Sequence, residues 1–156
     1  MKKMITSVKV RSYELDSFKH VNNGVYAHYL EKARGDYLQQ IGLTFKSFDE
    51  LKAWPVIAHL EIDYKYPAFF GDELTIETVV SKLGETSITL DYEIYNKDRK
   101  LIITASTRMV FVGENGNPTR MPNVFRNGFV DYGEWKTEAG ARDRKIKEVN
   151  KNENYI

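Results

Sequence analysis

One short polar stretch of the chain gathers side chains that could do chemistry. It runs from Asp16 to Gly24 and holds a carboxylate, an imidazole and two neighbouring amides. The segment after it has the periodicity of a helix, and a helix N-terminus carries unpaired N–H donors and a partial positive charge. Donors of this kind stabilise a carbonyl oxygen that becomes an oxyanion. The stretch is therefore a candidate site for chemistry at a carbonyl group.

A long amphipathic helix must position this stretch. Its apolar residues recur at steps of three and four, the period of a buried helical face, and they are Val25 or Tyr26, Tyr29, Leu30, Ala33, Tyr37, Leu38 and Ile41. Asn22 and Asn23 suit the N-cap, because a side-chain oxygen can accept a free N–H of the first turn. Gly42 suits the end of the helix, since glycine adopts the left-handed conformation at little cost. We predict one helix from about Gly24 to Ile41.

The remaining pattern is that of a meander of strands. Weak alternation predicts a first strand over 5–13, and clean alternation over 56–66 predicts a half-buried second strand. Three more strands follow over 74–80, 88–94 and 101–112. Residues 43–53 have the pattern of a short irregular connection, which has room for one helical turn with Phe45, Phe48 and Leu51, and a short helix is expected at 123–130. The apolar face of the long helix must be covered by the sheet. We therefore predict an α+β fold in which a five-stranded antiparallel sheet wraps around one long central helix.

Composition narrows the class of protein. The chain has 156 residues, of which 42% are hydrophobic, as in one globular domain. A formal net charge of +1 argues against a nucleic-acid partner. Cysteine is absent, which excludes thiolate chemistry and agrees with a reducing cytoplasm. The first residues lack the apolar run of a signal peptide, and no stretch approaches the ~20 apolar residues of a membrane span. We expect a cytoplasmic protein that is not in a membrane.

The last part of the chain differs from the rest. Residues 131–156 hold six Lys or Arg and six Asp or Glu, with few large apolar residues. We expect a charged helix or tail there, as an extension of a single domain formed by residues 1–130.

Two groups of residues resemble one known family. The first is Val10-Arg-Ser-Tyr-Glu-Leu-Asp16, His20-Val-Asn-Asn23, Tyr26, Tyr29, Leu30-Glu31 and Ala33-Arg34, and the second is Ile62-Asp-Tyr-Lys-Tyr-Pro67-Ala with Phe70-Gly-Asp72-Glu-Leu74. In this order they resemble the hotdog-fold acyl-CoA thioesterases of the 4-hydroxybenzoyl-CoA thioesterase-like group, over roughly residues 5–125. The resemblance implies hydrolysis of an acyl-CoA to a carboxylic acid and CoA without a cofactor. It also implies a homodimer or homotetramer with active sites at the subunit interface.

The resemblance implies roles for three residues of the polar stretch. Asp16 would act as nucleophile or general base, and the backbone N–H near Asn23 would polarise the thioester carbonyl. A carboxylate can attack to give an anhydride or can deprotonate a water. Asp16 also lies too far ahead of Gly24 to cap the helix directly, which favours the catalytic role. His20 is a further catalytic candidate, and its alternative is a structural, hydrogen-bonded histidine.

Other candidates surround this group. We take Asn22, Tyr26, Glu31 and His59 as candidate substrate contacts. Glu31 is also a rival catalytic carboxylate, or else a structural residue paired with Arg34 three positions on. His59 alternates with Glu61, Asp63 and Lys65, which suits a solvated or dimer-facing strand better than a metal site, so we predict no metal. The candidate contacts of the CoA phosphates are Lys82, Arg108, Arg120 and Arg126, and no feature of the sequence favours one of these four cations over the others.

Alternative functions fit the same fold. Hotdog hydratases set Asp and His five positions apart with Asn-Pro between them, whereas Asp16 and His20 are four apart with no proline. A non-catalytic acyl-CoA-binding protein would leave Asp16 without a task. The resembling plant acyl-carrier-protein thioesterases have Asn between the Asp and the His, where this chain has Phe18. That difference favours acyl-CoA over an acyl-carrier-protein substrate and leaves the acyl group open.

Overall fold

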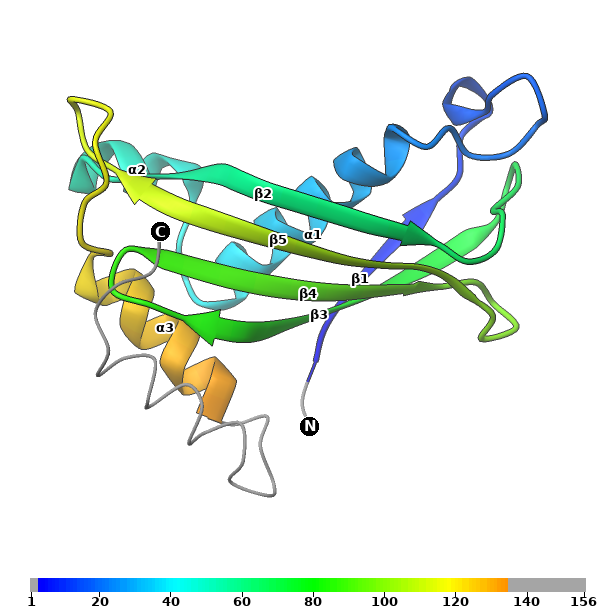
Figure 1. Cartoon of the computed structure of the whole chain (residues 1–156). Helices are drawn as coiled ribbons and strands as arrows, with labels where there is room; N and C mark the ends of the chain where they lie inside the picture. Colours follow the sequence, from blue (N-terminus) through cyan, green and yellow to red (C-terminus); the bar gives the residue numbers. More distant parts are fainter. Residues whose placement is uncertain (1–2, 135–156) are drawn as a thin grey trace.

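The computed structural model describes residues 3–134 of the chain. Its elements are β1 (Met4–Lys9), a 3-10 turn η1 (Ser12–Glu14), α1 (Val25–Gln40), α2 (Phe45–Leu51), β2 (Trp54–Tyr64), β3 (Glu73–Leu83), β4 (Ser87–Tyr95), β5 (Leu101–Val112) and α3 (Asn123–Glu134). The strands form one antiparallel sheet in the order β1-β3-β4-β5-β2. The long helix α1 lies against one face of the sheet, and α3 lies beside the end of β3 (Figure 1). The predicted five-stranded antiparallel sheet is confirmed.

Helix α1 has the buried face that its periodicity predicts. Its buried side chains are Tyr26, Tyr29, Leu30, Ala33, Tyr37 and Leu38. The helix ends at Gln40, and Gly42 follows with φ +79°, a conformation that glycine adopts at little cost. Burial of this stripe against the sheet fixes the direction in which the N-terminus of α1 points, and therefore where the preceding polar stretch lies.

The inner face of the sheet also follows the predicted alternation. The residues of β3 and β4 that point at α1 are all buried, namely Leu74, Ile76, Thr78, Val80, Ile88, Leu90, Tyr92 and Ile94. Strand β5 has the predicted bounds. Residues 45–51, expected in a mainly irregular connection, form the helix α2. Helix α3 lies where the sequence predicts it, although it continues to Glu134, past the predicted end of the domain at 130. The rest of the predicted charged extension, residues 135–156, lies outside the described residues.

Strands β1 and β2 differ from their predictions. β1 ends at Lys9, because Val10 N–H instead donates to the carbonyl of Asp72 and the chain turns into η1. Within residues 3–134, β2 is an edge strand that pairs with β5 alone, and a bulge between Ile57 and His59 interrupts its alternation. Most of β2 is exposed rather than half-buried.

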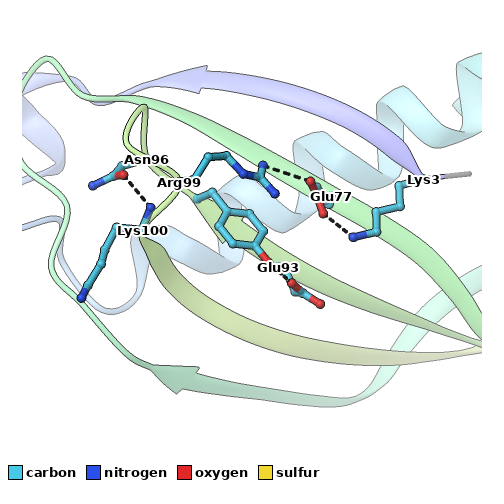
Figure 2. A network of polar contacts seen from close by, with 7 residues as sticks. Lys3, Glu77, Glu93, Asn96, Arg99 and Lys100 are labelled. Atoms are coloured by element: carbon cyan, nitrogen blue, oxygen red, sulfur yellow. Dashed lines mark hydrogen bonds and ion pairs between the residues drawn. The ribbon is translucent and has the colours of Figure 1, made fainter. Parts of the chain in front are cut away.

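The outer face of the sheet holds a network of ions. Lys3 Nζ lies 2.6 Å from Glu77 Oε2, and Arg99 Nη1 lies 3.1 Å from Glu77 Oε1 (Figure 2). Burial by itself would raise the pKa of Glu77, but the hydrogen bonds and charges of Lys3 and Arg99 outweigh it and hold that pKa below its ordinary value. The network ties the N-terminal segment and the β4–β5 turn to β3.

No helix among residues 3–134 has the length and apolar character needed to cross a membrane.

Candidate active site

The turn that starts at Asp16 closes on the Asp16 side chain. Asp16 Oδ1 accepts hydrogen bonds from the backbone N–H of Phe18 at 2.8 Å and of His20 at 3.2 Å. Asp16 N–H donates to the carbonyl of His20 at 2.8 Å. Lys19 takes φ +64° within this turn, so the chain reverses tightly. Asp16 Oδ2 has no hydrogen-bond partner among the described residues, which leaves one carboxylate oxygen available to a substrate or a water.

The start of α1 differs in detail from the predicted cap. The cap position is Gly24, which makes no side-chain capping bond. Asn22 Oδ1 instead accepts the N–H of Gly24 at 2.9 Å, and the Asn22 carbonyl accepts the N–H of Val25 at 2.9 Å. The prediction that Asn22 and Asn23 cap the first turn of α1 is therefore wrong, because Asn22 closes a turn just ahead of the helix. The N–H of Asn23 has no acceptor within residues 3–134 and is free to polarise a carbonyl.

Glu14 braces this arrangement from behind. Its carbonyl accepts the N–H of Asn22 at 2.8 Å, and its Oε1 accepts the N–H of Arg11 at 2.7 Å and the hydroxyl of Tyr29 at 3.0 Å. Burial and the adjacent Glu14 carboxylate raise the pKa of Tyr29, so its hydroxyl stays protonated and keeps donating. Glu14 thus connects Arg11, which precedes the Asp16 turn, and Asn22, which follows it, to Tyr29 of α1.

An open pocket of about 290 Å³ brings together four of the predicted residues. Asp16, His20, Asn23 and Tyr26 line it. The end of β2 and the residues after it form the opposite wall, with Tyr64, Lys65, Tyr66 and Pro67. Tyr26 packs edge-to-face on Tyr64, and burial is the main cause that raises its pKa to about 12. The imidazole of His20 packs edge-on against Phe69, with ring centroids 5.3 Å apart.

The pocket combines the parts needed for acyl transfer. Asp16 and Asn23 both line this pocket, and neither Asp16 Oδ2 nor the Asn23 N–H has a hydrogen-bond partner among residues 3–134. A carboxylate oxygen and a free N–H donor are the minimal set of groups for attack on a carbonyl and stabilisation of its oxyanion.

A family model described as the thioesterase-like superfamily matches residues 10–129. The chain belongs to the thioesterase-like superfamily. It is 29% identical over 126 residues to the acyl-acyl carrier protein thioesterase ATL3 of Arabidopsis thaliana, across 80% of this chain and 66% of that protein. It is 37% identical over 84 residues to the long-chain acyl-CoA thioesterase FadM of Escherichia coli, across 54% of this chain and 63% of FadM. These matches span about two thirds of the relatives' own length or slightly less.

Solved structures agree with this family. The structure of the DHNA-CoA thioesterase from Staphylococcus aureus superposes with a TM-score of 0.80 at 25% identity, covering 94% of this chain and 97% of that one. The antiparallel sheet with its long helix is therefore the hotdog fold that the sequence predicts.

The other candidate residues of this superfamily member lie outside the Asp16 pocket. Glu31 lines a different cavity, and His59 lies near Glu61 with His59 Nε2 3.6 Å from Glu61 Oε2. No ion pair joins Glu31 to Arg34 in the described part of the chain, which gives no support to the alternative that the two residues form a structural pair. Arg34 instead hydrogen-bonds to the hydroxyl of Tyr92 under the sheet.

Two of the cations considered for CoA binding have structural partners. Arg120 Nε lies 2.6 Å from Glu85 Oε1, and Arg126 Nη2 donates to the carbonyl of Gly84 and lies 3.5 Å from Glu85 Oε2. These contacts fasten the start of α3 to the β3–β4 turn.

Tyr64 is the site residue that sequence reasoning missed. Its hydroxyl donates to the carbonyl of Asn23 at 2.9 Å, which joins the end of β2 to the start of α1. The segment Ile62–Pro67 belongs to the motif that resembles the family, and this was the available signal. Nothing local to that motif shows that it meets Asn23.

A second cavity of about 180 Å³ lies between α1 and the sheet. Its lining is mostly apolar and comes from both short helices as well as from β2, β4 and β5, with Tyr37, Leu38, Phe45, Phe48, Pro55, Ile57, Ile88, Leu90, Met109, Phe111 and Phe129. Glu31 and Arg34 line it from α1. It shares no lining residue with the Asp16 pocket among the described residues.

Proposed function

We propose that this protein is an acyl-CoA thioesterase that hydrolyses an acyl-CoA to a free carboxylic acid and CoA. The observation that supports the proposal is that Asp16 and Asn23 line the same pocket. Asp16 Oδ2 and the N–H of Asn23 both lack a hydrogen-bond partner among residues 3–134. The family membership of the chain supports the same reaction class.

Asp16 supplies the attacking oxygen in either of two ways. It can attack the thioester carbon to give a mixed anhydride that water then hydrolyses, or it can deprotonate a water that attacks directly. In both cases the Asn23 N–H stabilises the oxyanion, an interaction that typically contributes ~2.7–4 kcal/mol per donor. The CoA thiolate then leaves and takes up a proton from solvent. His20 and Tyr26 contact the substrate from the same pocket wall.

We further propose that the protein assembles through β2. The outer edge of β2 has no neighbouring strand within residues 3–134, and this strand exposes Val56, Ile57, Leu60 and Tyr64. An exposed apolar edge of this length favours pairing with another strand. Antiparallel pairing of two β2 strands about a two-fold axis makes a homodimer with one continuous sheet, and dimers can pair again into a tetramer. Sedimentation velocity at micromolar concentration should show no 18.1 kDa species; a lone monomer would contradict this assembly.

The proposal also covers the group that carries the acyl chain and the location of the protein in the cell. Phe18 replaces the Asn of the resembling plant enzymes, which favours CoA as the carrier, although the chain is also similar to a plant acyl-acyl carrier protein thioesterase. Direct comparison of one acyl group on CoA and on acyl carrier protein decides this. A cytoplasmic location follows if the substrate is a cytoplasmic CoA thioester.

Free thiol release tests the reaction itself. Purified protein is given a panel of acyl-CoA thioesters, and CoA is followed with a thiol reagent. Thiol release supports the thioesterase, a change in enoyl absorbance without thiol supports a hydratase, and saturable binding without either supports a non-catalytic acyl-CoA-binding protein. The proposed chemistry uses a carboxylate and backbone dipoles, so EDTA should leave turnover unchanged.

A further inference from the structure

We infer that the cavity between α1 and the sheet receives the acyl group, and that Phe48 limits its length. The substrates are then thioesters of a single-ring or short-chain acyl group rather than of a long fatty acid. This inference rests on the proposed thioesterase function and on the proposed β2 dimer.

The size of the cavity sets the first limit. An apolar cavity of ~150 Å³ in a protein core holds one benzene molecule. The cavity here has a volume of about 180 Å³. By the same measure it holds one aromatic ring or a hydrocarbon group of similar volume. A sixteen-carbon chain does not fit unless the walls move.

Three aromatic rings that pack on one another form part of the cavity wall and the layer behind it. Phe48 of α2 is buried and stacks on Phe125 of α3, with ring centroids 4.8 Å apart and an interplanar angle of 18°. Phe111 of β5 lies 6.4 Å from Phe48 and 5.5 Å from Phe125. Phe48 and Phe111 line the cavity, whereas Phe125 is fully buried behind them. Shortening Phe48 therefore extends the cavity towards Phe125.

The rim of the cavity has a different character. Phe45, one turn before Phe48 on α2, is 65% exposed. Glu31 is exposed on α1, and Arg34 forms a hydrogen bond with the hydroxyl of Tyr92. The charged groups of the lining thus lie on the α1 side, and the inner wall from α2, β4 and β5 is apolar, as a hydrocarbon group requires.

The dimer brings the cavity to the carbonyl site. Within one chain, eight residues of helix separate Asn23 from Glu31, which is about 12 Å along the axis. In antiparallel pairing of two β2 strands, the start of one strand lies beside the end of the other. Pro55 and Ile57 line the cavity at the start of β2, and Tyr64 at its end holds the carbonyl of Asn23. Each cavity therefore faces the carbonyl site of the partner subunit.

The test is a chain-length profile of wild type and Phe48→Leu. We expect wild-type kcat/KM for saturated acyl-CoA thioesters to peak at or below eight carbons, with benzoyl-CoA accepted. Chains of fourteen and sixteen carbons should react at least about tenfold more slowly, since each methylene a pocket cannot hold costs that order of discrimination. Phe48→Leu should move the peak two to four carbons longer. Leu51→Ala, on the same helix but outside the lining of the cavity, should leave the peak in place.

Each outcome separates this inference from the proposed function. A wild-type peak at fourteen or sixteen carbons, or an equal shift in Leu51→Ala, would overturn the role of Phe48. Loss of folding in Phe48→Leu is recognised by circular dichroism, and Phe48→Met then provides the second variant. If no thioester is hydrolysed, the proposed function fails, and calorimetry with the thioethers S-hexyl-CoA and S-hexadecyl-CoA still decides the length limit. Tighter binding of the hexadecyl than of the hexyl compound by wild type would contradict it.

Discussion

The hydroxyl of Tyr64 donates a 2.9 Å hydrogen bond to the backbone carbonyl of Asn23, across 41 positions of sequence. The bond fixes the peptide that follows Asn23, and the bond from Val25 N–H to the Asn22 carbonyl fixes the peptide that precedes it. The free Asn23 N–H is therefore held from both sides. Tyr64 belongs to the exposed edge strand, so the proposed assembly through β2 and the geometry of the proposed oxyanion donor involve the same residue.

Removing the Tyr64 hydroxyl should loosen this donor. We predict that Tyr64→Phe lowers kcat by about two- to tenfold, since a typical net hydrogen bond contributes ~0.5–1.5 kcal/mol. KM should change little, because the ring still packs on Tyr26. Steady-state kinetics measures both, and sedimentation checks that the assembly persists. Tyr66→Phe is the matched control on the same pocket wall; an equal loss there would show that the bond to Asn23 is not the cause.

Asp16 carries the sharpest prediction. Asp16→Asn keeps the shape of the side chain and can still accept the N–H of Phe18, but its amide can neither attack nor take a proton. We predict a fall in kcat of at least ~100-fold, the low end for a positioned acid or base, with little change in KM. Asp63→Asn, on the outer face of β2, should be neutral.

Glu31 provides the rival to Asp16. If Asp16→Asn turns over normally while Glu31→Gln is inactive, the helix carboxylate is the nucleophile or base and the Asp16 pocket is not the active site. Full activity in both variants would contradict the proposed mechanism altogether.

The bond from Tyr29 to Glu14 should matter for positioning and not for chemistry. Tyr29→Phe removes one of the two donors to Glu14 Oε1 and frees the turn behind Asp16. We predict a fall in kcat of about two- to tenfold, together with a lower melting temperature. The pH profile should keep its shape, because no titrating group of the pocket is lost. A change in that shape would mean that Tyr29 takes part in proton transfer.

The ion network on the outer face should act on stability alone. The folded-state pKa of Glu77 lies below its ordinary value of 4.5, so the network stabilises the fold above that pH and the contribution is lost as pH falls through the folded pKa. We predict that Glu77→Gln has a lower melting temperature than wild type at pH 7 and that the difference shrinks in acid below about pH 4.5. Differential scanning calorimetry across this range measures it. Glu73→Gln, an exposed carboxylate on the same strand, should change little.

The sequence by itself determined the elements whose geometry is local. The three-and-four spacing of α1 and the strict alternation of β3 and β4 reappear as buried faces, because side-chain direction repeats every 3.6 residues in a helix and every two in a strand. The polar turn ahead of α1 was identifiable because its residues are close in sequence. Asp16, His20 and Asn23 lie within eight positions, and they line one pocket.

Tertiary structure decided what depends on neighbours. The alternation of β2 suggested a half-buried strand, but its edge position and its bulge follow from which strands pair, which no local period encodes. Glu31 and Arg34 are three apart on one helix, so pairing between them was one alternative, but Arg34 hydrogen-bonds to the hydroxyl of Tyr92 on the sheet. Tyr64 reaches Asn23 only because the sheet order brings the end of β2 to the start of α1. Contacts between residues far apart in sequence are selected by packing, and for this reason the wall of the pocket became visible only in the folded chain.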